Sequence, residues 1–222
     1  MSEPGPVILT KSSPTVSLDK HGVTSGLVRV NLKWSSARAA AQSQARQAHG
    51  LLGKVRASLQ TAATKDVDLD LGCLISFSDG GTAVVQALGN AFGALDRPPF
   101  VALDADDRTG GLAGENLTIN LSEQARFSKL LLFVYIYGGS GDFRGLDAKV
   151  TLTSDSGESF ELHLDDSPPD SNACAIALIT REKGELIIER EVRWFTPEGG
   201  AGIQEVISRD YDFAIQWTRG RK

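Results

Sequence analysis

Apolar and polar residues alternate one by one in many strand-length segments of this 222-residue chain. No other feature constrains its fold as strongly. The segment 27–34 reads LVRVNLKW, so every second side chain is apolar. Because successive side chains of a strand point to opposite faces of a sheet, this pattern predicts a half-buried strand. Similar alternation, or a short apolar run, predicts further strands over 66–78, 82–88, 116–121, 129–137, 148–153, 158–164, 173–181, 185–195 and 211–217.

Gly, Asp and Pro separate these short segments, which predicts an all-β fold, an antiparallel β-sandwich. Lys183-Gly184 lies between two predicted strands and is expected to form a hairpin turn. The length suits one large β domain, so we expect a single domain over 15–222 after a flexible leader over 1–14. The leader lacks the basic and apolar regions of a signal peptide, which predicts a cytoplasmic protein. Cys73 and Cys174 lie in apolar runs and are expected to be reduced core thiols.

Residues 35–65 interrupt the strand pattern with a segment rich in Ala, Gln and Ser. This insertion carries several basic residues and no acid, and we expect it to be partly helical or disordered. One interpretation is a contact for an anionic membrane surface or an acidic partner. The preferred alternative is a solvated excursion between two strands. The candidate contact residues are Arg38, Arg46, Lys54 and Arg56.

Negative charge dominates the chain, with a net charge of −5 and a pI near 5.3. This balance argues against a general nucleic-acid-binding protein, which needs a basic face. The acids are clustered, first as Asp66, Asp68 and Asp70. On a strand these three carboxylates would line one face, where they repel one another unless a cation neutralises them.

A second acidic cluster lies in a Gly-rich loop over 103–116. Calcium prefers six to eight oxygen ligands from carboxylates, amides, backbone carbonyls and water, and this loop supplies them. An EF-hand is excluded because Arg108 and Thr109 occupy its fifth and sixth positions, the sixth of which requires glycine. Acids that merely form turns are the alternative to a metal site. The candidate metal ligands of both clusters are Asp68, Asp70, Asp104, Asp106, Asp107, Glu115 and Asn116.

Several segments together give the chain a resemblance to a known family. They are VSLDKHG at 16–22, VRVNLKW at 28–34, VDLDLGCL at 67–74, VQALGNAFG at 85–93, PPFVALDADDRTG at 98–110, GENLTINL at 114–121, FVYIYGG at 133–139, CAIALI at 174–179 and VRWF at 192–195. In this order they resemble the TerD-domain family of tellurium-resistance and stress-response proteins, closest to its TerA-type members. The resemblance covers nearly the whole chain.

The resemblance implies a calcium-binding β-sandwich in the bacterial cytoplasm that acts in tellurite and general stress resistance. It also implies no enzymatic activity, and assemblies with other Ter-family proteins near the inner membrane. The family's DLD motif matches Asp68 and Asp70, and its Asp-Asn-Arg-Thr-Gly stretch matches residues 106–110. Its Gly-Asp-Asp matches residues 114–116, where Glu115 and Asn116 replace the two acids. Residues 111–113 carry no acid, so we expect one calcium ion and leave a second open.

Three functions remain open from the sequence. The leading hypothesis is a calcium-dependent scaffold or partner-binding module. The second is a module that docks on membranes in a calcium-dependent way, as C2-like sandwiches do, with lipid contacts from the basic insertion. The third is a metal-assisted hydrolase in which Asp70 and Asp106 hold the ion, but the sequence offers no general base or nucleophile for it.

Overall fold

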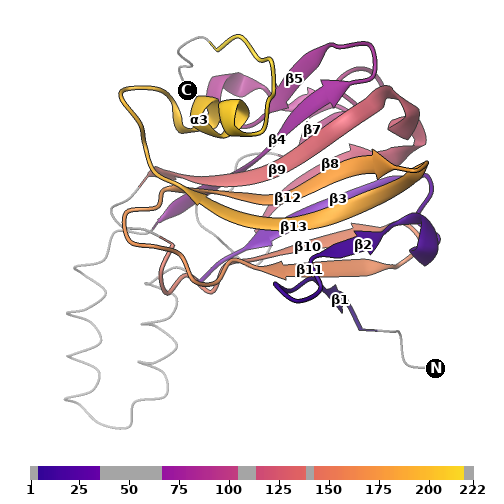
Figure 1. The fold of residues 1–222 in the computed structure, drawn as a ribbon, viewed down its shortest axis with the longest axis horizontal. Coiled ribbons are helices and arrows are strands. Elements are labelled where there is room, and N and C mark those ends of the chain that lie inside the picture. Colours follow the sequence, from indigo (N-terminus) through magenta and orange to yellow (C-terminus); the bar gives the residue numbers. More distant parts are fainter. Residues whose placement is uncertain (1–4, 36–66, 105–113, 139–142, 218–222) are drawn as a thin grey trace, which may run out of the picture.

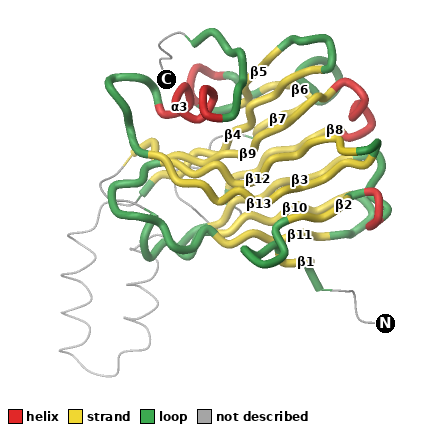
Figure 2. The backbone as a smooth tube through the Cα atoms, in the orientation of Figure 1, coloured by secondary structure: helices red, strands yellow, loops and turns green. Residues whose placement is uncertain are grey.

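The computed structural model describes residues 5–35, 67–104, 114–138 and 143–217, and two β-sheets account for most of this part of the chain (Figures 1 and 2). The predicted all-β sandwich is confirmed. The first sheet has the strand order β1-β11-β10-β3-β8-β7-β6. Its strands are β1 (Val7–Ile8), β3 (Leu27–Lys33), β6 (Gly93–Ala94), β7 (Val101–Leu103), β8 (Glu115–Asn120), β10 (Lys149–Ser154) and β11 (Ser159–His163).

The second sheet has the order β2-β13-β12-β9-β4-β5. Its strands are β2 (Thr15–Ser17), β4 (Asp68–Phe77), β5 (Thr82–Val85), β9 (Phe127–Gly138), β12 (Ala173–Glu182) and β13 (Glu185–Phe195). Neighbouring strands run antiparallel in both sheets except β1 and β11, which are parallel. Short helical segments are η1 (Asp19–His21), η2 (Leu88–Asn90), η3 (Leu121–Arg126) and α3 (Ile203–Asp210).

The main core lies between the two sheets, and alternation in the sequence explains which residues enter it. On β3, Val28, Val30 and Leu32 are buried, as the sequence predicts. Lys183 and Gly184 form the predicted hairpin turn between β12 and β13, both with positive φ. Burial of both cysteines as free thiols is also confirmed.

A second apolar cluster covers the outer face of the β4–β9 region. Because β9 is apolar on both faces, Leu131 and Phe133 point outwards, opposite to the core residues Leu130 and Leu132. The helix α3 and the segment after it pack over this outer face (Figure 1). The β4–β9 layer is therefore buried on both sides.

The predicted strand over 211–217 is wrong. This segment pairs with no strand and follows α3, which the sequence reading missed. Its alternating side chains Tyr211, Phe213 and Ile215 pack on the outer apolar cluster. Burial of every second side chain therefore produced the period of two without any strand pairing.

Two further predicted segments have different outcomes. The leader supplies β1, and Leu9 behind it is buried in the main core. The basic insertion lies outside the described residues, apart from position 35, and so do its candidate contact residues. In the part that the structure describes, no helix is long and apolar enough to cross a membrane.

Candidate metal centre

Asp70 is a fully buried carboxylate on the outer face of β4. Its neighbours Leu69 and Leu71 point into the main core, so Asp70 points to the opposite side, under α3. The register pairs Asp70 with Tyr135 of β9. Asp68 has the same orientation two residues earlier and is partly exposed at the start of the strand. Because both residues lie two apart on β4, their carboxylates are on the same face of the strand, as the sequence predicts.

The Tyr135 hydroxyl donates a hydrogen bond to Asp70 Oδ2 at 2.7 Å. Burial raises the pKa of Tyr135 above its ordinary value, and the Asp70 charge raises it further. The hydroxyl therefore stays protonated as a donor to the carboxylate. Gln204 of α3, which is also buried, hydrogen-bonds to Tyr135. A chain of polar contacts thus connects β4, β9 and α3 beneath the helix.

Glu115 approaches the same stretch of β4 from the other sheet. It is 2% exposed and points into the sandwich, because its cross-strand partner Leu32 is a core residue. The pairing of β4 with β5 ends at Cys73 and Val85, and beyond that point the Leu71 amide donates to Glu115 Oε2 at 2.5 Å. The Glu115 carboxylate therefore takes the place of a strand partner and joins the two sheets at this edge.

Asp104 and Asn116 meet at the base of the acidic loop. The Asp104 amide donates to the Asn116 carbonyl at 2.8 Å, so the two ends of the loop are held together. The Asn116 side chain points to the opposite face of β8 from Glu115 and accepts a hydrogen bond from Asn31 Nδ2 at 2.9 Å. Asp104 is exposed. The structure thus separates the Asn116 side chain from the Glu115 carboxylate.

Gly114 lets the returning strand approach β3 closely. Its φ is +67°, in the left-handed region, and a Cβ there would lie 2.2 Å from the Leu32 carbonyl oxygen. Only glycine fits this position without displacing backbone. It fixes where Glu115 begins β8 and hence where the carboxylate enters the sandwich.

Two of the predicted ligands, Asp70 and Glu115, are thus brought to one short stretch of β4 from different sheets. Beyond the effect of burial, both carboxylates raise the pKa of Tyr135, so each acts electrostatically on the same hydroxyl. Burying a carboxylate is costly, and a cation reduces that cost. Their oxygen chemistry fits calcium. Within the described ranges, however, no group of three or more His, Cys, Asp or Glu side chains is gathered for a metal ion. Asp106 and Asp107 lie outside the described residues.

The sequence reading missed two polar residues at this centre, namely Tyr135 and Gln204. Tyr135 lies within the most apolar run of the chain, so it reads as a core residue. Its role depends on the β4–β9 register, which composition does not reveal. Gln204 was missed together with its helix, although the spacing of Ile203, Val206 and Ile207 is a helical signal.

Comparison with known proteins agrees with the family resemblance of the sequence motifs. The chain is 35% identical over 217 residues to the tellurium resistance protein TerA of Alcaligenes sp. The matched region makes up 97% of this chain and 58% of that relative. The chain therefore spans well under two thirds of the curated relative. No protein-family model matches the chain.

Proposed function

Because the chain belongs to the TerA-like family of tellurium-resistance proteins, we propose that it is a calcium-binding, non-enzymatic component of a bacterial tellurite and stress resistance system. It acts in the cytoplasm as a scaffold that binds other Ter-family proteins, some of them near the inner membrane. The observation that carries the calcium assignment is the pair of buried carboxylates, Asp70 and Glu115, beside the base of an acidic loop.

Asp68, Asp70 and Glu115 would supply carboxylate oxygens to the ion, and Asp104 lies at the loop base. Asp106 and Asp107 remain predicted ligands from the sequence. A bound calcium ion would offset the cost of burying carboxylates at this edge of β4. The protein's own contribution is orientation, because Tyr135 fixes Asp70 and the Leu71 amide fixes Glu115.

A chemical role for the thiols in tellurite reduction is disfavoured. Burial raises the pKa of both Cys73 and Cys174 above the ordinary thiol value. Since the thiolate is the reactive form, both side chains are expected to be inert in the folded protein. A non-enzymatic role in binding therefore fits these residues better than direct reduction.

Calcium titration by calorimetry on chelator-stripped protein tests the proposal. We expect a Kd of roughly 10⁻⁶ to 10⁻⁵ M, in the range of calcium sensors. Asp70→Asn and Glu115→Gln each keep an oxygen that accepts the observed hydrogen bond but remove the charge, so each is expected to weaken binding at least about tenfold. Glu189→Gln, an exposed acid on β13, is the matched control and should leave the Kd unchanged. Folded Asp70→Asn and Glu115→Gln variants that bind calcium like the wild type would contradict the assignment.

A further inference from the structure

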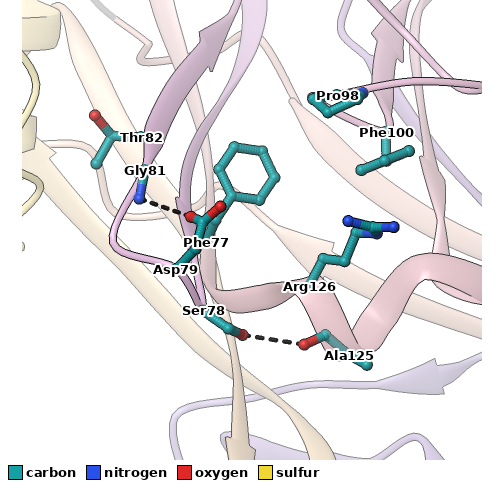
Figure 3. A pocket seen from close by; sticks show the side chains of 9 residues that line it. All are labelled: Phe77, Ser78, Asp79, Gly81, Thr82, Pro98, Phe100, Ala125 and Arg126. Atoms are coloured by element: carbon teal, nitrogen blue, oxygen red, sulfur yellow. Dashed lines mark hydrogen bonds between the residues drawn. The ribbon is translucent and has the colours of Figure 1, made fainter.

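A cavity of about 420 Å³ lies at the opposite end of β4 from Asp68 and Asp70. Three segments form its walls, namely the turn between β4 and β5, the loop that precedes β7, and the end of η3 (Figure 3). Its volume is within the range of small-molecule sites, about 300–1,000 Å³. None of the candidate calcium ligands lines it.

Hydrogen bonds hold these walls together. The Ser78 amide donates to the Arg126 carbonyl at 2.8 Å, and the Ser78 hydroxyl donates to the Ala125 carbonyl at 3.0 Å. On the third wall, the Phe100 carbonyl accepts from the Asn120 amide at 2.9 Å. The cavity is therefore formed before any ligand arrives, and binding would require little ordering of the chain.

The lining combines aromatic surfaces with one cation. Figure 3 shows the Phe77 and Phe100 rings on different walls, with the Arg126 guanidinium beside Phe100. The guanidinium carbon lies 5.3 Å from the centre of the Phe100 ring. Arg126 Nε donates to Glu123 at 2.7 Å, so this side of the guanidinium is already paired with a carboxylate. Its terminal nitrogens are the natural partners of a planar carboxylate.

We propose that this cavity binds a small aromatic carboxylate. The ring would pack against Phe77 and Phe100, where aromatic surfaces favour offset or edge contacts. The carboxylate would accept hydrogen bonds from the terminal nitrogens of Arg126. Asp79 lines the same cavity, so a second negative charge on the ligand is disfavoured. The ligand class is accordingly a monoanion or a zwitterion.

Titration of the full chain with benzoate, followed by amide chemical shifts in NMR spectra, tests this site. We expect saturable shifts at the β4–β5 turn and at η3, with a Kd on the order of 1 mM for so small a ligand. Arg126→Gln should weaken binding about tenfold, because it removes charge-assisted hydrogen bonds. Arg97→Gln removes an exposed guanidinium that does not line the cavity and should change the Kd less than about twofold.

Two further measurements make the test decisive. Ala125→Trp keeps the charge of the cavity but fills it from an exposed position, and it should abolish binding. The dianion phthalate should bind more weakly than benzoate because of Asp79. Equal affinity of benzoate for wild type and Arg126→Gln, or shifts confined to other regions, would overturn the proposal. The benzoate Kd should be the same with calcium and with chelator present. A failure of the protein to bind calcium would therefore leave the benzoate result intact.

Discussion

At the scale of single residues, the buried hydrogen bond between Tyr135 and Asp70 holds the candidate metal centre together. A buried carboxylate needs donors, and the Tyr135 hydroxyl is one of them at 2.7 Å. Asp70 belongs to an acidic cluster in the sequence, but only the sheet register shows that Tyr135 is its partner. The loss in the free energy of unfolding when one partner is removed therefore measures how strongly this hydrogen bond stabilises the centre.

Tyr135→Phe is expected to lower the free energy of unfolding by about 1–3 kcal/mol, because it removes a donor from a buried charged acceptor. Urea denaturation of chelator-stripped protein measures this change. In an Asp70→Asn background the cost of Tyr135→Phe should shrink, and an undiminished cost would show that the hydroxyl does not act through the carboxylate.

At the scale of elements, β4 and β9 pack closely because of one glycine. A Cβ at Gly72 would lie 2.4 Å from Cζ of Phe133, its cross-strand partner on the outer face. The large ring fills the space that the missing side chain leaves. This pair lies next to Asp70 and Tyr135, so it also sets the spacing of the strands that carry the centre.

Gly72→Ala should destabilise the protein by about 1–3 kcal/mol through overpacking of this pair. Phe133→Leu in the same chain should recover part of the loss, because it removes the atoms in the way. Thermal and urea unfolding measure both variants. Gly138→Ala on β9 meets only an ordinary contact at 3.7 Å and serves as the control. An additive double variant would argue against a direct clash.

Element prediction from the sequence worked where burial and strand pairing coincide. The segments of β3, β9, β12 and β13 were all predicted, because their alternation or apolar runs reflect burial on one or both faces. The short strands β1, β2, β6 and β7 escaped detection, because two or three residues show no period. The segment 211–217 shows the opposite error. Its alternation predicted a strand, but its apolar side chains pack on the outer face of a sheet without strand pairing.

The candidate site could be predicted only in part, for a similar reason. Acid clustering identified Asp70 and Glu115 as chemically important without their positions in space. Side chains alternate between the two faces of a strand, so the adjacent residues Glu115 and Asn116 point to opposite faces of β8. Which carboxylates share an environment depends on how two sheets meet, and local sequence does not encode this.

At the scale of the whole molecule, calcium is expected to stabilise the fold because it would join strands of both sheets. At about 100 times the Kd, a ligand specific for the folded state adds about 2.7 kcal/mol. For a domain of this size, that corresponds to a rise in Tm of about 5–10 °C. Differential scanning calorimetry with calcium and with chelator measures the shift. The double variant Asp70→Asn/Glu115→Gln should show no calcium-dependent shift, and a rise like that of the wild type would refute this linkage.

The hydrogen bond between the Leu71 amide and Glu115 also decides what the loss of this side chain would cost. Beyond the end of β5 no strand pairs with this amide, and both residues are buried. Without the carboxylate the amide would be a buried donor with its acceptor removed, which costs about 1–3 kcal/mol. The same side chain that is a candidate metal ligand thus completes the backbone hydrogen bonding of β4, so its loss would weaken the fold as well as ion binding.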